Sequence, residues 1–510
     1  MKRSFVILLF CLTLPITLLA RPALADQMPG FDSALAASVW SAALDYIEPR
    51  ALDSVSIPQM TIWGLNSLAG LDPNLNTILQ DGQIRLFGPN SLILAIAAPP
   101  ANDAKAWGKA AAEVVQAAYA VSQPLQQAGT QGIISNFFDE LFNHFDPYSR
   151  YEGPLQAAQD QLMIVGLAGT GLTLEDRLGQ VVISHVASDS PASDAGLEPG
   201  MIVTSVNGRR VYSSMVANLN SGMQGLPGSQ YLLSFVDPQS ETASPQSVVL
   251  KRNFIPPQTV FVEPPLQPGL DVIRISGFNK GTGDQFAQAL AALMSQSPPL
   301  AGLVIDLRGN RGGVLRQAVL VADSLLNSGP IVKTSGRDRD ADQSFSAEGA
   351  DITNGARIVV LVDGQTASAA EILSSALADN DRAVVIGSET LGKGLVQTVT
   401  SLPDGGELFV TWSRVLAPRG WPLQGLGLMP QICTSNGPSS LSQQLAALQK
   451  GRNLMAPILA KARAIRPPVS IDQILAIRDY CPADIGGELD EQAALAVLNN
   501  SEIYKAALLH

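Results

Sequence analysis

The segment Gln365-Thr-Ala-Ser-Ala-Ala-Glu-Ile-Leu373, followed by Leu391-Gly-Lys-Gly-Leu-Val-Gln397, decides how this 510-residue chain folds and what chemistry it carries. An apolar run, Arg357–Val362, precedes Ser368, and an alanine-rich stretch, 369–378, follows it. This order predicts a buried strand that turns into a helix at the serine.

Ser368 and Lys393 are the candidate nucleophile and base. A serine hydroxyl becomes a nucleophile when a neighbouring group accepts its proton, and a lysine amine accepts it when burial lowers the lysine pKa. Glycines on both sides of Lys393 allow close packing around the amine. A histidine base is disfavoured, because His144, His185 and His510 all lie outside the predicted α/β region. The alternatives are a plain helix-capping serine and an exposed lysine in a glycine-rich turn.

Three further positions complete the predicted site. Gln397 lies four residues after Lys393, so in an extended strand both side chains share one face and the amide oxygen is placed to orient the amine. The backbone N–H groups of Ala369, at the helix start, and of Gly312, in a glycine-rich turn, are the predicted donors to an oxyanion. The alternative for Gly312 is an ordinary loop between a strand and a helix.

The residue pattern changes three times along the chain. Residues 31–145 indicate helices, with apolar residues at three- and four-residue spacings. Residues 160–252 alternate short apolar strands with Gly, Asn and Pro turns, which predicts a small β-barrel. From 272 to 411 strands and helices alternate, which indicates an α/β sheet covered on at least one face. Beyond Pro438 the tail is predicted to be helical.

Six motifs in a fixed order resemble those of the carboxyl-terminal processing peptidases, also called tail-specific proteases. The resemblance covers about residues 137–432, and it rests on the number and order of the motifs rather than on any one of them. They are Asp146-Pro-Tyr-Ser-Arg-Tyr151, Ser190-Pro-Ala with Ala195-Gly-Leu197, Asp306-Leu-Arg-Gly-Asn-Arg-Gly-Gly313, Thr366-Ala-Ser-Ala-Ala-Glu371, Gly392-Lys-Gly394 with Gln397, and Gln424-Gly-Leu-Gly427 with Pro430.

The resemblance implies an α/β multidomain protein with a crotonase- or Clp-protease-like catalytic core, an inserted PDZ β-barrel and helical N- and C-terminal regions. It implies that Ser368 is the nucleophile, Lys393 the general base and Gln397 its partner. Glu371 also matches a family position, although a first-turn acid that complements the helix dipole is an equal alternative. The chain departs from the family at Arg311, where proline is common.

The β-rich region carries the resemblance to a PDZ domain. In that family a loop of backbone amides holds the terminal carboxylate of a peptide, and the following strand edge pairs with the extended chain. Residues 172–174 are the predicted edge, and Met201 replaces an acid common in the family. The alternative is a purely structural β-domain. The loop positions that match are Gly169, Thr170, Gly171 and Leu172.

The expected function is an exported serine endopeptidase that captures the unstructured C-terminal tails of protein or peptide substrates and cleaves them with a Ser–Lys dyad. The alternative is a catalytically silent PDZ scaffold that binds peptides in the periplasm, and the joint presence of Ser368, Lys393 and Gln397 favours the enzyme. No cofactor is expected. An adaptor protein and a homo-oligomer are left open as further partners. The expected divisions are signal peptide 1–25, N-terminal helical region 26–153, PDZ domain 154–252, peptidase core 253–435 and C-terminal helical tail 436–510.

The first 25 residues have the layout of a secretory signal peptide. Lys2 and Arg3 precede an apolar run at 5–19, and a small-x-small site, 23–25, precedes Asp26. A membrane anchor is the alternative, but the run is short for a span. Processing leaves 30 basic and 45 acidic residues, a net charge of −15 in place of −12, because the leader also contains Arg21. Such a chain is a poor ligand for nucleic acid, and a periplasmic or secreted bacterial protein without a membrane span is expected.

Two cysteines remain after removal of the leader, which contains Cys11. An even number of thiols in an exported chain favours a disulfide, here between Cys433 and Cys481. The alternatives are two free buried thiols or a metal site, and no metal site is expected because two cysteines without clustered histidines make a poor zinc set.

Overall fold

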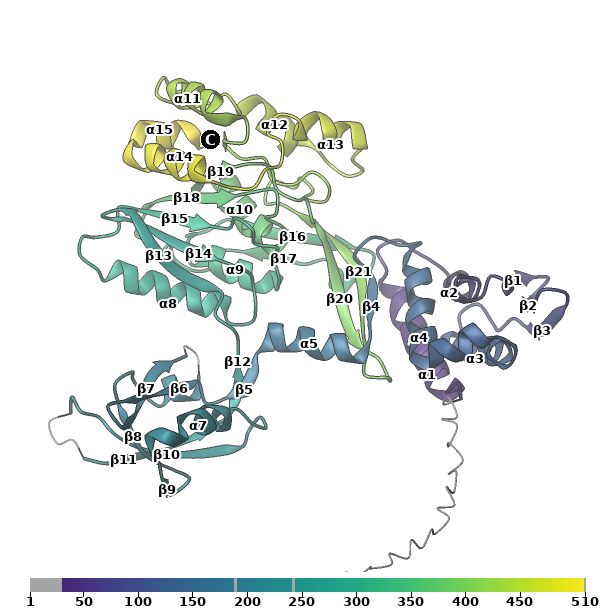
Figure 1. Ribbon diagram of the computed structural model, residues 1–510. Helices are drawn as coiled ribbons and strands as arrows, with labels where there is room; N and C mark the ends of the chain where they lie inside the picture. Colours follow the sequence, from purple (N-terminus) through teal and green to yellow (C-terminus); the bar gives the residue numbers. More distant parts are fainter. Residues whose placement is uncertain (1–29, 188–189, 241–243, 509–510) are drawn as a thin grey trace, which may run out of the picture.

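The computed structural model describes residues 30–187, 190–240 and 244–508 (Figure 1). The predicted signal peptide, 1–25, lies outside these ranges, as does His510. A central α/β body carries a helical region on one side and a smaller β-rich unit below it (Figure 1). Within the described ranges, no helix combines the length and apolarity needed to cross a bilayer.

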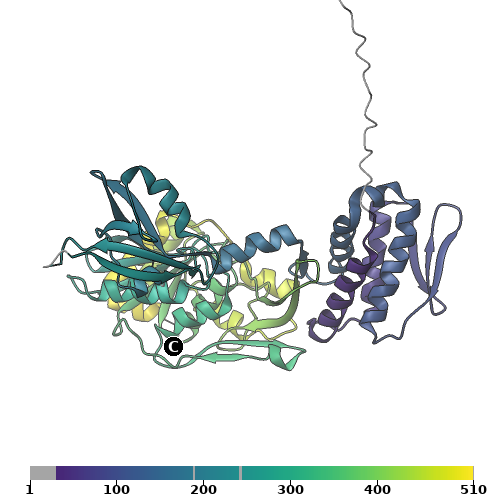
Figure 2. The same cartoon turned by 90° about the horizontal axis from the view of Figure 1, so that it is seen from below.

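The N-terminal region is a bundle of four helices that lie side by side at one end of the molecule (Figure 2). Each helix begins at a residue whose side-chain oxygen accepts a backbone N–H of the first turn, namely Asp32, Ser56, Asp103 and Ser122. The helices are α1 (Ser33–Arg50), α2 (Ile57–Leu71), α3 (Ala104–Val121) and α4 (Gln123–Phe142).

A three-stranded antiparallel sheet interrupts this region, which the sequence predicts to be mainly helical. Asp81 and Gly82 have φ values of +52° and +69°, the left-handed pair that a two-residue hairpin turn requires. Four helices thus make up most of this region, and the sheet between α2 and α3 was not expected from the sequence. The strands are β1 (Asn76–Gln80), β2 (Gln83–Phe87) and β3 (Leu92–Ala97).

The α/β body is built on a six-stranded sheet, in which an antiparallel edge strand is followed by five parallel strands. Ile358, Val360 and Val362 point into the core on one face, and Val359 and Leu361 into the core on the other. Both faces are thus buried, which explains the continuous apolar runs. In spatial order the strands are β13 (Val260–Gln267), β14 (Leu270–Ile275), β15 (Gly302–Asp306), β18 (Arg357–Val362), β19 (Ala383–Gly387) and β22 (Ile432–Cys433).

Helices cover the two faces of this sheet. One core includes residues of α8 (Thr282–Met294), α9 (Leu315–Asp323), α10 (Ala369–Asp379), α12 (Ala456–Ala464) and α13 (Ile471–Arg478). The other includes α11 (Gly437–Leu448), α14 (Glu488–Asn499) and α15 (Ser501–Ala507), which lie above the sheet in Figure 1. The predicted disulfide is present between Cys433 at the end of β22 and Cys481 after α13, with an S–S distance of 2.10 Å.

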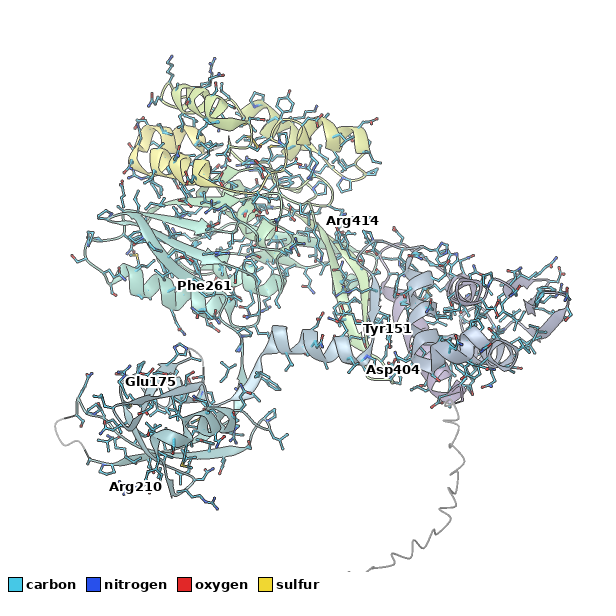
Figure 3. The ribbon with its side chains drawn as sticks, in the orientation of Figure 1. Tyr151, Glu175, Arg210, Phe261, Asp404 and Arg414 are labelled. Atoms are coloured by element: carbon cyan, nitrogen blue, oxygen red, sulfur yellow. A yellow bond between two sulfur atoms is a disulfide. The ribbon has the colours of Figure 1, made fainter. Side chains whose placement is uncertain are left out.

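A second sheet joins the body to the N-terminal helices. Its long arm reaches α1 and α4 (Figure 1), where Leu408 and Val410 enter the core of the N-terminal region. Near the tip of the arm the Tyr151 hydroxyl donates a hydrogen bond to Asp404, and the two side chains meet in Figure 3. The strands are β17 (Ser344–Ser346), β16 (Pro330–Gly336), β21 (Glu407–Leu416) and β20 (Leu395–Ser401), with β4 (Arg150–Glu152) on β21, and a 3₁₀ turn, η2 (Arg339–Ala341), follows β16.

The β-rich unit contains one sheet in the order β11-β10-β8-β7-β6, with β9 on β8. Its end strands are not paired with each other in the described residues, so the sheet is open and the expected closed barrel is not formed. Ser190 caps α6 as predicted. The elements are β6 (Leu172–Arg177), β7 (Gln180–Val186), α6 (Pro191–Asp194), β8 (Ile202–Val206), β9 (Arg209–Arg210), η1 (Ser213–Met215), α7 (Val216–Met223), β10 (Gln230–Val236) and β11 (Gln246–Lys251).

A helix and a short ribbon connect this unit to the rest of the chain (Figure 1). The helix α5 (Pro154–Val165) leads in from β4, and β5 (Leu167–Gly169) pairs antiparallel with β12 (Asn253–Ile255), which leads out to the body. Both entry and exit therefore run through one pair of strands.

Candidate active site

Ser368 lies at the turn from β18 into α10, as the sequence predicts. Its φ is +55° and its ψ −116°, whereas an ordinary N-cap residue has an extended backbone. A non-glycine residue in this region is strained, and such strain is found at sharp turns that expose a nucleophile between a strand and a helix. Asp363 holds the turn, because its carboxylate accepts hydrogen bonds from the N–H groups of Gln365 and Thr366, each at 2.9–3.0 Å.

One buried carboxylate connects the two predicted catalytic segments. Glu371 accepts hydrogen bonds from the backbone N–H of Ser368 at 2.8 Å, of Gly392 at 2.8 Å and of Lys393 at 2.9 Å, and from the Thr390 hydroxyl. Burial raises the pKa of the Glu371 carboxyl, and the four donated hydrogen bonds act against that rise. Glu371 therefore positions the serine and the lysine relative to each other, a role that sequence reasoning left undecided.

Lys393 is half-buried, and its environment favours the neutral amine. Burial lowers the pKa of Lys393, and the positive charge of Arg150 lowers it further. Its Nζ lies 4.9 Å from the centre of the Tyr148 ring. In the described part of the chain, no hydrogen bond joins Lys393 Nζ to Ser368 Oγ. The lysine side chain lies against the Tyr148 ring instead.

Gln397 lies beside Lys393 in the sequence but points elsewhere. Its Nε2 donates to Thr411 Oγ1 at 3.0 Å, and that hydroxyl donates to Asp146 Oδ1 at 2.8 Å. Among the described residues no hydrogen bond links Gln397 to Lys393. The reason is local, because β20 begins only at Leu395 and its pairing register with β21 shifts between Val396 and Gln397, so simple alternation from Lys393 does not hold.

The two predicted oxyanion donors lie together. A Cβ added to Gly312, whose φ is +91°, would come within 2.9 Å of the Ala369 nitrogen and 2.7 Å of the Ser368 Cβ, so only glycine fits. The Gly312 N–H, however, donates to Asn310 Oδ1 at 2.8 Å. Asn310 is fully buried and also donates to Ile275 O, which fixes the loop against β14.

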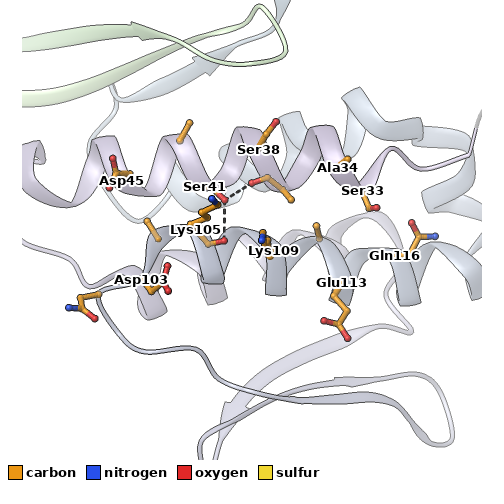
Figure 4. Close-up of a pocket in the computed structure, with 15 residues that line it drawn as sticks. Ser33, Ala34, Ser38, Ser41, Asp45, Asp103, Lys105, Lys109, Glu113 and Gln116 are labelled. Atoms are coloured by element: carbon orange, nitrogen blue, oxygen red, sulfur yellow. Dashed lines mark hydrogen bonds between the residues drawn. The ribbon is translucent and has the colours of Figure 1, made fainter.

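The predicted peptide-binding loop lines a cavity of about 340 Å³ in the β-rich unit. Gly169, Thr170, Gly171 and Leu172 all contribute to its wall, together with apolar side chains that include Met223. A second cavity, of about 1250 Å³, lies between α1 and α3 (Figure 4) and contains none of the predicted site residues. Within the described ranges, no cluster of three or more His, Cys, Asp or Glu side chains is arranged to hold a metal ion.

Comparison with known proteins shows that the chain is similar in sequence to peptidases. Residues 270–434 match the family described as peptidase family S41. The chain is 31% identical over 307 residues to the carboxy-terminal-processing protease of Bartonella bacilliformis, covering 59% of this chain and 69% of that relative. It is 33% identical over 291 residues to the carboxyl-terminal-processing protease of Synechocystis sp., covering 56% and 67%. Among solved structures it is similar to a photosystem II D1 C-terminal processing protease, with 26% identity, a TM-score of 0.36, and coverage of 73% of this chain and 92% of that one.

Proposed function

This chain belongs to peptidase family S41, among its carboxyl-terminal processing serine peptidases, and from that premise we propose that it is an endopeptidase with a Ser368–Lys393 dyad. The observation that carries the proposal is the Glu371 carboxylate, which binds the backbone N–H groups of both residues. The lowered pKa of Lys393 supports the role of base, since only a neutral amine accepts a proton.

The reaction would proceed by acyl transfer. The Lys393 side chain leaves the Tyr148 ring and accepts the proton of Ser368 Oγ, which forms a bond to the carbonyl carbon of the scissile peptide. The N–H of Ala369 stabilises the resulting oxyanion, and the N–H of Gly312 joins it when released from Asn310. Lys393 then donates its proton to the departing amine, and a water molecule hydrolyses the acyl-enzyme.

Residues 154–252 serve in this proposal as a PDZ domain that captures the C-terminal tail of a substrate. Two features support it, namely the edge position of β6 in its sheet and the cavity beside Gly169 and Thr170. The signal-like leader and the disulfide support export to the periplasm or beyond. The peptidase core would be 253–435, with the helical regions 26–153 and 436–510 around it.

Cleavage of a denatured protein tests the catalytic assignment. Ser368→Ala and Lys393→Ala should each stay folded and lose turnover by on the order of 10³-fold or more. Lys333→Ala is the matched control, because Lys333 is an exposed lysine on β16, in the same sheet as the strand that follows Lys393. Full turnover by Lys393→Ala would exclude the proposed base, and no cleavage by the wild-type chain would favour the silent scaffold.

A further inference from the structure

The free edge of β6 is already occupied by a side chain of the protein itself. β6 is the last strand of its sheet, so residues on its outer side have no strand partner among the described residues. The N–H of Leu174 donates to Asn220 Oδ1 at 2.8 Å, and Asn220 Nδ2 donates to Leu174 O at 2.9 Å. Asn220 lies on α7, so one amide side chain satisfies both main-chain groups of one strand residue.

This pair of hydrogen bonds is the one that an added strand would make. In an antiparallel pair, one residue of the partner strand exchanges an N–H and a C=O with the residue opposite it. A primary amide offers the same donor and acceptor. Asn220 also lines the cavity beside Gly169 and Thr173, so it occupies the groove assigned above to the substrate tail.

We propose that Asn220 is an internal competitor of the captured tail, whose amide must leave Leu174 before an extended peptide pairs with β6. The proposal rests on the proposed tail capture by residues 154–252. It predicts that peptide affinity is lowered, because a peptide forms main-chain hydrogen bonds at Leu174 only after the two hydrogen bonds between Leu174 and Asn220 break. Short or poorly extended tails, which offer few additional contacts, are then rejected most strongly.

The helix that carries Asn220, α7, also contacts the predicted carboxylate-binding loop. Met223 O, at the end of α7, accepts hydrogen bonds from Thr170 N at 3.1 Å and from Arg252 Nε at 3.2 Å. This end of the helix is therefore held, while Asn220 lies one turn earlier on the part that faces the strand edge. Asn220 is therefore released by rotation of its own side chain, while the end of α7 that contacts Thr170 stays in place.

Peptide binding to the full chain tests the competitor. The background is Ser368→Ala, which prevents cleavage of the probe. The probe is a fluorescein-labelled peptide of about ten residues that ends in valine with a free carboxylate, and fluorescence anisotropy gives its Kd. Asn220→Ala should lower the Kd by about 5- to 50-fold, since the two competing hydrogen bonds are gone. Asn218→Ala, an exposed asparagine on the same helix, should leave the Kd unchanged.

Hydrogen exchange supplies a second readout that does not depend on affinity. The Leu174 amide should exchange faster in free Asn220→Ala than in the free parent and equally slowly when each is saturated with peptide. Asn220→Asp keeps the acceptor and loses the donor, so its Leu174 amide should exchange at a rate between those of the parent and of Asn220→Ala. This variant also covers the case in which Asn220→Ala fails to fold.

The outcomes separate this inference from tail capture itself. Tighter binding by Asn220→Ala supports both. Equal or weaker binding by Asn220→Ala, with clear binding by the parent, overturns the competitor and leaves tail capture standing. A peptide amidated at its C-terminus should bind poorly to every variant. If the free acid also binds to none of them while denatured protein is still cleaved by the active chain, tail capture by this unit fails and the competitor fails with it.

Discussion

Replacing Glu371 by glutamine tests whether one carboxylate holds the serine and lysine segments in register. Oε1 accepts from the Thr390 hydroxyl and Gly392 N, and Oε2 accepts from Ser368 N and Lys393 N. A glutamine keeps one acceptor oxygen and places an NH₂ donor where the other was. At least one backbone N–H must then lose its partner inside a fully buried site.

The cost follows from which oxygen is replaced. With the NH₂ group at the Oε1 position, the Thr390 hydroxyl is able to turn and accept, and only Gly392 N–H is left unpaired, at a cost of about 1–3 kcal/mol. The opposite orientation leaves Ser368 N and Lys393 N unpaired and costs about twice as much. Since glutamine also avoids the burial of a charge, we expect a loss of about 1–2 kcal/mol of unfolding free energy. We expect a larger effect on rate, about 10²-fold in kcat, because the two reacting side chains lose their common anchor.

Urea unfolding and single-turnover cleavage measure the two effects separately. Glu389→Gln is the matched control, because Glu389 is a buried glutamate that pairs with Arg478 at 2.7 Å and, in the described part of the chain, forms no hydrogen bond or ion pair with Ser368 or Lys393. That variant should change stability without a comparable loss of kcat. A Glu371→Gln protein with wild-type kcat would refute the positioning role, whatever its stability.

Three further changes have expected outcomes. Gly312→Ala should reduce kcat by about 10²-fold or more, because the added methyl would lie 2.7 Å from Ala367 O and from the Ser368 Cβ, at a φ of +91° where alanine is strained. Gly309→Ala, at a positive-φ glycine with open space around it, controls for strain alone. Single-turnover rates should rise with pH as Lys393 loses its proton, with a midpoint below that of an ordinary lysine. Arg150→Gln should move this midpoint to higher pH, since the removed positive charge is the smaller of the two causes that lower the pKa; an unmoved midpoint would count against Lys393 as the titrating base. Cys433→Ser should cost about 4 kcal/mol in urea unfolding, from the entropy of a 48-residue loop, and a reductant should destabilise the wild type but not this variant.

The strand and helix that present Ser368 could be predicted almost to the residue. The predicted strand is β18, and the predicted helix, 369–378, is one residue shorter than α10. Both predictions succeed because the two elements are buried except at Arg357, so the apolar pattern alone indicates the structure. The hairpin at 76–87 was missed, although Asp81-Gly82 between two alternating runs is a recognisable turn signal.

The structure brings several of the predicted site residues near one another, but the contacts among them did not follow from the sequence. Gly312 lies against Ser368 and Ala369, and the Glu371 carboxylate links the backbone of Ser368 to that of Lys393. Contacts that depend on register or on distant backbone groups were not predictable. A shift in strand register beside Gln397 directs its side chain away from Lys393, and no residue type in the sequence indicates that shift. The N–H groups of Gly392 and Lys393, which donate to Glu371, belong to a loop about twenty residues later in the chain.

The backbone angles of Ser368 have a consequence for the evolution of the chain. Glycine adopts a φ of +55° freely, so its introduction at this position would relieve about 1 kcal/mol of strain even after its larger entropy in the unfolded state is counted. Selection for thermal stability alone would therefore favour replacement of Ser368 by glycine. A variant library screened for heat resistance, without an assay of cleavage, should become enriched in inactive variants at this position.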